Sequence, residues 1–448
     1  MKNFSKTVCK IAIPVTLQSM LQSSFSIIDQ LMIGQLGENS IAAVGLGGNF
    51  CLIYSVVLGA IATVAGVLIA QFLGAADEKE AWRGFSVSML SGLCVAALFT
   101  FASFLFAGPI LGLYTPDART ILEGTPYLRI VSFTFLPMAI STVIATWLRC
   151  SEHATLPLAA SFVAVLVNTS LNYVLIFGKL GLPALGVVGA GYATVISQLV
   201  NLLLMGIGFL WSLKKDQKKM MFSIHLEHLT FGEYLAMICP ILISEFLWSL
   251  GQNVNSAVYG HLGTDSLAAY TLTTPIQGMF CGALSGLSAA AGVMIGKQLG
   301  KKDYDGAYRD SKRLLWLSLC SSLVLALVLI LLSGCYVSFY PVQENVGYVA
   351  KLLLYVFALY APVKVLNMVL GGGIIRSGGN TKLIMIIDII GTWCVGVPLL
   401  LFAAYVLKLS VVPVYAILTF EEVVRLVITM VVFMKKTWMR SLHRNQTV

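Results

Sequence analysis

Charged side chains are scarce in this sequence of 448 residues. Asp, Glu, Lys and Arg together make up 11% of the chain, whereas hydrophobic residues make up 58% and the mean hydropathy is +0.87. A soluble domain carries about 25% charged residues. The chain therefore has too little polar surface to form a soluble globule of this length, and we expect it to lie in a lipid bilayer.

Motifs for metals, cofactors and catalysis are also missing. The nine cysteines are scattered singly, with no CxxC pair and no histidine at metal-ligand spacing, so they fit small hydrophobic residues better than a metal or redox site. The segment around Gly296 and Lys297 superficially resembles a phosphate-binding loop, but Ala291 replaces the first glycine and Gln298 the Ser or Thr of that motif. No cluster of carboxylates or histidines and no nucleophile elbow indicates an enzyme. We therefore predict no cofactor, no nucleotide and no enzymatic activity.

The sequence contains many long runs of uncharged residues. A helix that spans a bilayer needs about 20 predominantly apolar residues. The runs predict twelve such spans, at residues 8–34, 44–73, 84–108, 121–148, 156–178, 186–212, 233–260, 268–298, 312–338, 347–375, 382–407 and 411–434. The predicted fold class is an all-α polytopic membrane protein with 12 transmembrane helices.

The chain is an internal duplication. Residues 14–83 reappear 226 positions downstream without a gap, so that IGQLGENSIAA (Ile33–Ala43) aligns with YGHLGTDSLAA (Tyr259–Ala269). Nine of the nineteen residues from Ala65 to Arg83 are identical to their counterparts. A duplicated unit of this size is typical of transporters that are built from two homologous bundles of membrane helices.

The twelve spans divide into six and six. Because six is an even number, both halves enter the membrane from the same side, and the halves are predicted to be parallel repeats. We predict an N-lobe at residues 1–213, a cytoplasmic linker at residues 214–232, and a C-lobe at residues 233–448 that ends in a short cytoplasmic tail.

Lysine and arginine gather on one side of these spans. The termini and every second loop hold 22 of the 29 Lys and Arg residues. Cytoplasmic loops of membrane proteins carry such an excess, so we predict a multi-pass protein of the plasma (inner) membrane with both termini cytoplasmic. The same asymmetry accounts for the net charge of +9. A nucleic-acid partner is not expected, because it would need basic and aromatic residues interleaved on one soluble face.

Polar side chains inside the spans are the candidate functional residues, because they are costly in lipid unless they face a cavity or a partner. Gln18, Gln22 and Asp29 lie within about 40° of one another around the first helix, where successive residues are 100° apart. This polar stripe either lines a cavity or forms a hydrogen-bonded seam with another helix. Asn168 and Asn172, at i and i+4 in the fifth span, should also point inward.

A similar stripe follows the seventh span, where Glu245, Ser249, Gln252 and Ser256 share one face. Either intramembrane acid, Asp29 or Glu245, would respond to a coupling ion by changing its protonation state or by binding Na⁺. The two stripes therefore give each lobe one candidate carboxylate.

Four further charges lie in the second half. Asp388 and Lys364 either form a structural ion pair or contact a substrate, and the sequence leaves both interpretations open. Glu421 and Arg425 stand at i and i+4, so we expect them to neutralise each other within one helix.

Three motifs together carry a family resemblance. Pro14 is followed fifteen residues later by Asp29, which opens DQLMIGQLG (Asp29–Gly37); SIAAVG (Ser40–Gly45) follows, and PALGVVGAGYAT (Pro183–Thr194) comes later. With these motifs the chain resembles the multidrug and toxic compound extrusion (MATE) family over nearly its whole length. The resemblance implies two six-helix lobes around a central cavity that opens to one side at a time. It also implies export of drug-like compounds in exchange for H⁺ or Na⁺.

The resemblance assigns roles to individual residues. Asp29 would be the ion-coupling carboxylate, with Asn168, Asn172 and Thr194 as its polar neighbours, and these four would hold Na⁺ if Na⁺ is the coupling ion. Pro14 would bend the first helix. The polar and charged residues that we expect to line the substrate cavity are Gln18, Gln22, Glu245, Ser249, Gln252, Asp388 and Lys364. Some members of the family carry an aspartate where this chain has Asn172, which leaves the identity of the ion open.

The resulting hypothesis is a secondary antiporter that exports amphipathic, often cationic organic compounds by alternating access. Aromatic and Met side chains would supply bulk, and Asp29 or Glu245 would supply charge. The alternative is a flippase or exporter of a lipid-linked or polyanionic substrate, which needs many basic residues in its cavity; Lys364, Lys351 and Arg129 are the candidates. The expected partners are small organic substrates and the lipid bilayer, and we expect a monomer.

Overall fold

A computed structural model describes residues 2–217, 219–221, 230–338 and 343–443, and every regular element in these ranges is helical. The first half contains α1 (Lys2–Gly34), α2 (Glu38–Gly74), α3 (Glu78–Gly112), α4 (Ala118–Val131), the 3₁₀ turn η1 (Ser132–Thr134), α5 (Phe135–Cys150), α6 (Thr155–Phe177) and α7 (Gly186–Lys215). The second half contains α8 (Phe231–His261), α9 (Thr264–Gly300), α10 (Tyr304–Ser338), α11 (Glu344–Asn367), η2 (Met368–Ile375), η3 (Arg376–Gly378), α12 (Thr381–Ile389), η4 (Ile390–Gly396), α13 (Val397–Leu401), η5 (Phe402–Val406), α14 (Val411–Leu418) and α15 (Phe420–Met434).

These elements join into six helical rods in each half. The rod of α4 and α5 is continuous through η1, the rod of α11 continues through η2 and η3, and the rod of α12 runs on to η5. Within the described residues, ten rods are long and apolar enough to cross a membrane; α1 and the rod of α14 and α15 complete the twelve. The predicted all-α, polytopic fold with 12 transmembrane helices is confirmed.

The duplication is visible in the element boundaries. α2 and α9 are each 37 residues long and begin 226 positions apart, and α3 and α10 are each 35 residues long with the same offset. The two halves of the sequence therefore fold into the same succession of helices.

The chain divides into two compact units. The first comprises Ile13–Ile69 and Asp77–Glu227 and is called the N-terminal unit here; the second comprises Met1–Ala12, Ala70–Ala76 and His228–Val448 and is called the C-terminal unit. The start of α1 and the last residues of α2 thus belong with the second half of the chain. The lobe boundaries expected from the sequence do not include this exchange.

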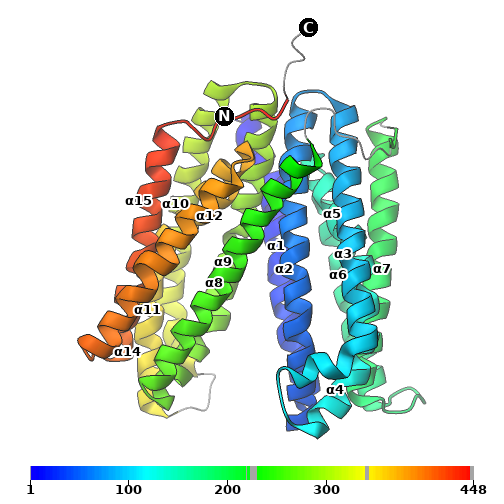
Figure 1. Cartoon of the computed structure of the whole chain (residues 1–448), viewed down its shortest axis with the longest axis vertical. Helices are drawn as coiled ribbons and strands as arrows, with labels where there is room; N and C mark the ends of the chain where they lie inside the picture. The colour runs from blue at the N-terminus through cyan, green and yellow to red at the C-terminus, as the bar shows by residue number, and fades with distance from the viewer. Residues whose placement is uncertain (1, 218, 222–229, 339–342, 444–448) are drawn as a thin grey trace. The chain divides into compact units, whose positions relative to one another are not determined.

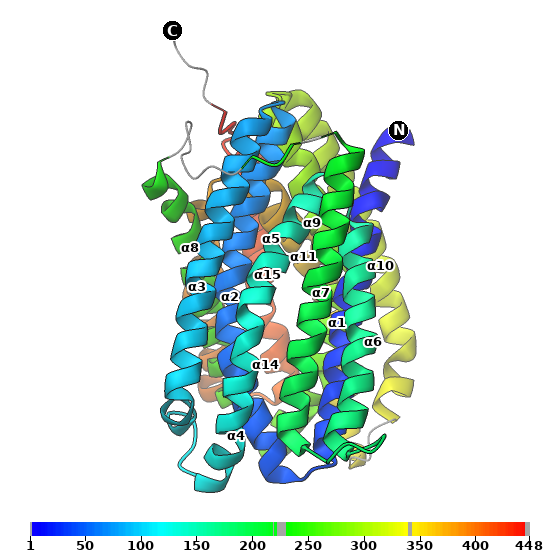
Figure 2. The same cartoon turned by 90° about the vertical axis from the view of Figure 1, so that its right-hand side faces the viewer.

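In the N-terminal unit the long helices α2, α3, α5, α6 and α7 run alongside one another (Figure 2). α6 packs against α7, and α3 packs against α4 and α5. A cluster of aromatic side chains joins α3, α5 and α7: the rings of Trp82 and Trp147 stack with centroids 4.0 Å apart, and Phe85 and Phe209 pack beside them. This cluster fixes the end of α5, where Arg149 follows Trp147 by two residues.

In the C-terminal unit α8 packs against α12 (Figure 1). α15 packs against α11 and η4. The chain beyond α15 folds back onto this unit. Trp438 is fully buried and donates a hydrogen bond to the carbonyl of Phe433, and its own carbonyl lies so close to Gly378 that a methyl group there would overlap it. Glycine is therefore required at the turn that η3 forms.

Gln71, at the end of α2, binds the same returning segment. Its amide nitrogen donates to the carbonyls of Ser377 and Arg440, at 2.6 and 3.2 Å, and its amide oxygen accepts from the backbone N–H of Leu442 at 2.7 Å. Because Gln71 is fully buried, these bonds satisfy polar groups that would otherwise be orphaned.

The ends of α2 and α9 meet through glycines. A methyl group on Gly74 would overlap the backbone of Lys297, and one on Gly300 would overlap the backbone of Gln71. Gly74 and Gly300 are repeat equivalents, and so are Gln71 and Lys297. The contact is thus symmetric, and close approach of the two backbones requires glycine on both sides.

A surface turn shows how the connections are stabilised. Asp117 precedes α4 and accepts hydrogen bonds from the hydroxyl and backbone N–H of Thr120 and from the N–H of Arg119. These bonds, the one from the Thr120 hydroxyl first, lower the pKa of Asp117. The carboxylate therefore stays ionised at neutral pH and caps the helix.

Candidate functional site

Asp29, on α1, heads a chain of polar contacts in the N-terminal unit. Nδ2 of Asn172, on α6, lies 2.5 Å from Oδ1 of Asp29 and 2.7 Å from Oδ1 of Asn168. Nδ2 of Asn168 in turn lies 3.1 Å from Oγ of Ser197, on α7. Three helices are thereby joined through side chains, and three of the four predicted ion-coupling residues lie together.

The surroundings of this chain are apolar. Asn168 and Asn172 are 2% and 0% exposed, and Asp29 is half-buried. Ile33, one turn from Asp29 on α1, packs in a core cluster with Tyr127 and others. A carboxylate in such a setting is costly unless a partner offsets its charge, and the Asn172 amide is the hydrogen-bond donor that the structure places beside it.

One atom of the cluster lacks a partner. Within the described residues, Oδ1 of Asn172 is buried and accepts no hydrogen bond. Leaving a buried acceptor unsatisfied costs about 1–3 kcal/mol. The Asn172 side chain also donates to the Asp29 carboxylate. An amide group and a carboxylate group therefore lie side by side, and their oxygens are of the kind that hard cations prefer as ligands.

Thr194 enters the cluster through its backbone. Its hydroxyl donates to the carbonyl of Ala190 at 2.9 Å, whereas its own carbonyl accepts from the Ser197 hydroxyl at 2.9 Å. Ser197 is the member that the sequence analysis missed. It lies three residues after Thr194 and hence on the same helix face, which is the signal that could have identified it.

Gln18 belongs to a separate contact in the same unit. Its amide nitrogen donates to Oγ of Ser161, on α6, at 2.8 Å, and its amide oxygen accepts from Nη2 of Arg149, on α5, at 2.9 Å. Gln22, one turn further along α1, is exposed. Pro14 is buried in the same helix, and α1 continues through it.

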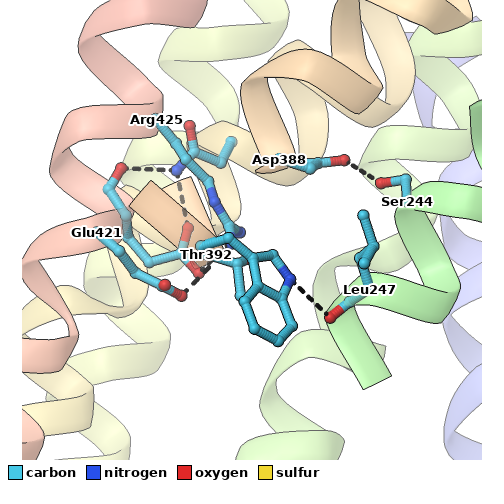
Figure 3. A network of polar contacts seen from close by, with 9 residues as sticks. Ser244, Leu247, Asp388, Thr392, Glu421 and Arg425 are labelled. Carbon is cyan, nitrogen blue, oxygen red and sulfur yellow. Dashed lines mark hydrogen bonds and ion pairs between the residues drawn. The ribbon is translucent and has the colours of Figure 1, made fainter. Parts of the chain in front are cut away.

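In the C-terminal unit, Figure 3 shows the polar contacts of α8, α12, η4 and α15. Oγ of Ser244 donates to Oδ2 of Asp388 at 2.5 Å, and the indole N–H of Trp393 donates to the carbonyl of Leu247 at 3.2 Å. Arg376 interacts electrostatically with both Asp388 and Glu245. The two candidate acids of this unit therefore share one basic neighbour, which the sequence analysis did not identify.

The other predicted cavity residues are less connected. Ser249 is exposed and Gln252 is half-buried, and neither side chain makes a hydrogen bond within the described part of the chain. Lys364 interacts electrostatically with Glu422, and no ion pair joins Lys364 to Asp388 among the described residues. The Lys364–Asp388 ion pair that the sequence allowed does not form. Asp388 instead accepts a hydrogen bond from Ser244, and Lys364 interacts electrostatically with Glu422.

Arg425 organises a second network on α15. Nη2 of Arg425 lies 3.5 Å from Oε1 of Glu421, as the i, i+4 spacing predicts, and Nη1 lies 3.8 Å from Oε1 of Glu422. Arg425 also donates to the hydroxyl of Thr392, and Asn367 donates to Oε2 of Glu422 at 2.9 Å. Intrahelical neutralisation is thus confirmed, and it extends to two neighbouring rods.

The π-helical segment η4 makes room for this network. A methyl group on Gly391 would overlap the side chain of Arg425, and one on Gly396 would overlap the carboxylate of Glu421. Segments of π-helix are rare and often lie at functional sites. Here the wide turn and its two glycines let charged side chains approach the backbone of α12 and η4 closely.

Comparison with known proteins places these features in a family. The family model described as MatE matches residues 14–174 and 240–402, two segments that begin at the repeat-equivalent Pro14 and Pro240. The probable multidrug resistance protein NorM of Thermotoga maritima is 23% identical over 97% of this chain and 93% of its own. The multidrug resistance protein NorM of Burkholderia vietnamiensis is 26% identical over 87% of this chain and 85% of its own.

Solved structures show the same fold. The Vibrio cholerae MATE transporter VcmN in its bent form superposes with a TM-score of 0.85 at 18% identity, covering 97% of both chains. An outward-facing multidrug resistance MATE family transporter gives 0.86 at 16% identity, covering 97% of this chain and 96% of its own. With a family model that matches both halves of the duplicated sequence, this chain belongs to the MatE family of multidrug and toxic compound extrusion transporters.

Proposed function

We propose that the protein is a secondary antiporter that exports amphipathic, often cationic organic compounds in exchange for H⁺ or Na⁺. The observation that carries this proposal is the polar chain from Asp29 through Asn172 and Asn168, a carboxylate held by buried amides within a membrane helix bundle. The names of the NorM relatives, which describe multidrug resistance proteins, support the substrate class.

The geometry suggests how an ion would act. Asn172 donates to two acceptors, the Asp29 carboxylate and the Asn168 carbonyl oxygen. A hydrogen bond to an ionised acceptor is roughly twice as strong as one to a neutral acceptor. Protonation of Asp29, or Na⁺ bound to it, would therefore weaken the bond between α1 and α6 and shift Asn172 toward Asn168. The charge on one carboxylate would thus control how α1 packs in its own unit.

We propose that Glu245 contributes to recognition of cationic substrates. It is half-buried on α8, and its charge is only partly offset, because Arg376 is shared with Asp388. Two acids beside one base leave a net negative charge, which attracts an organic cation.

A transport assay with the purified protein tests the proposal. Protein in proteoliposomes loaded with a cationic dye such as ethidium should release the dye when an inward H⁺ or Na⁺ gradient is imposed, and should do so without ATP. Dye movement that ignores both gradients would contradict antiport. Release driven by one gradient alone would identify the ion.

We further propose that both termini and the linker at residues 214–232 face the cytoplasm. The lysine and arginine asymmetry supports this orientation. Lys215 is exposed at the end of α7, so Lys215→Cys in a background without other cysteines should resist an impermeant maleimide in intact cells and react after lysis. Labelling of intact cells would reverse the topology.

A further inference from the structure

Arg149 and Arg376 occupy the same position in the two repeats. Each lies at the end of its rod, in LRCSEHAT (Leu148–Thr155) and IRSGGNTK (Ile375–Lys382), and at an offset of 227 residues the arginine is the one identical residue of these segments. The residue three positions later has a left-handed backbone in both, Glu152 with φ 65° and Gly379 with φ 78°. The two arginines therefore enter equivalent turns.

The hydrogen bonds beside the arginines are equivalent too. In the N-terminal unit Gln18 donates to Ser161 at 2.8 Å, and in the C-terminal unit Ser244 donates to Asp388 at 2.5 Å. Gln18 corresponds to Ser244 at the 226-residue offset, and Ser161 corresponds to Asp388 at the 227-residue offset. One constellation of an arginine and two polar side chains thus exists twice in the chain.

The two copies differ in charge. Arg376 has Asp388 and Glu245 as electrostatic partners. Arg149 has the amide of Gln18 as its hydrogen-bond partner, and it has no acidic electrostatic partner among the described residues. Its Nε atom is buried without a partner, although the residue as a whole is only partly buried. A guanidinium without an anion in a largely apolar bundle is costly.

We propose that Arg149, Gln18 and Ser161 form a subsite for an oxyanion, the carboxylate of an amphipathic organic substrate. This inference rests on the proposed export function and names the residues that would bind a carboxylate group of the substrate. The planar guanidinium has five N–H donors and matches a carboxylate in a fork geometry. The carboxylate would take the place that the Asp388 side chain fills in the other repeat. The same chemistry would accept a lipid phosphate, so the test must separate the two sources.

Equilibrium binding to detergent-purified protein, with no gradient present, tests the subsite apart from transport. The probes are 1-naphthoate and its neutral amide, 1-naphthamide. Ser161→Asp copies the carboxylate of the other repeat beside Arg149 and should weaken naphthoate binding about tenfold or more, while naphthamide binding stays unchanged. Ser161→Asn, which has the size of aspartate without its charge, is the matched control and should weaken naphthoate binding far less than Ser161→Asp does.

Arg149→Gln gives an independent variant if aspartate at position 161 impairs folding. It should remove the preference for naphthoate over naphthamide. Equal binding of both probes by the unaltered protein, or a preference that survives in Arg149→Gln, would overturn the inference. Added phosphatidylglycerol that displaces naphthoate from the unaltered protein, but not zwitterionic phosphatidylcholine, would confirm the oxyanion site and assign it to a lipid headgroup. Because no ion gradient is involved, failure of antiport would leave this result intact.

Discussion

Asp29→Asn is expected to reduce gradient-driven efflux to the level of empty liposomes while the protein still folds and inserts. The amide keeps the size of the side chain and its contact with Asn172 but never carries a negative charge. The bond between α1 and α6 would then stay in its weakened state whether or not an ion is present. The measurement is dye efflux from proteoliposomes under imposed H⁺ and Na⁺ gradients, with insertion checked by size-exclusion chromatography of the purified protein.

Glu245→Gln is the matched comparison for this result. It removes an acid from the other unit, and it should weaken the apparent affinity for cationic dyes while gradient coupling persists. If the Asp29→Asn variant still exports dye against a gradient at the normal rate, the coupling residue would instead be Glu245 or Asp388. Loss of coupling in both variants would mean that each unit contains a carboxylate required for coupling.

Arg425→Met is expected to destabilise the C-terminal unit strongly. Removal of the guanidinium leaves the carboxylates of Glu421 and Glu422, whose side chains are 14% and 12% exposed, without their ion-pair partner. Breaking a buried pair by removing one partner costs about 3–5 kcal/mol. The free energy of unfolding in mixed micelles should fall by this amount.

Arg313→Met is the control, because Arg313 also pairs with an acid on its own helix, at 3.1 Å from Asp310, but its side chain is 42% exposed. An exposed pair contributes about 0–1 kcal/mol. Similar losses in the two variants would show that the network around Arg425 is no more important than a surface ion pair.

Much of this architecture could be predicted from the sequence, because apolar runs and an ungapped repeat determine where helices begin. The equal lengths and offsets of α2 and α9 follow directly from the duplication. The clustering of Asn168 and Asn172 followed from their i, i+4 spacing, since residues at that spacing share a helix face.

The contacts between rods could not be predicted in the same way. Helical spacing predicts the helix face on which a residue lies, but not the helix that this face contacts. The sequence therefore allowed an ion pair between Lys364 and Asp388, whereas in the structure Lys364 interacts electrostatically with Glu422. The link from Gln18 to Arg149 joins residues 131 positions apart. The sequence shows the glycines of η4 but not why they are required. The structure gives the reason, because the side chains of Arg425 and Glu421 lie directly against them.

The contact between the ends of α2 and α9 bears on how such a chain arose. Gly74 meets Lys297 and Gly300 meets Gln71, so each surface is the counterpart of the other. This is the isologous pattern of a twofold homodimer, in which residue i contacts j and j contacts i. A single six-helix ancestor could therefore have paired with a second copy of itself through this same patch before gene fusion. The two copies now differ at this position: Gln71 binds the C-terminal segment, where the other repeat has Lys297.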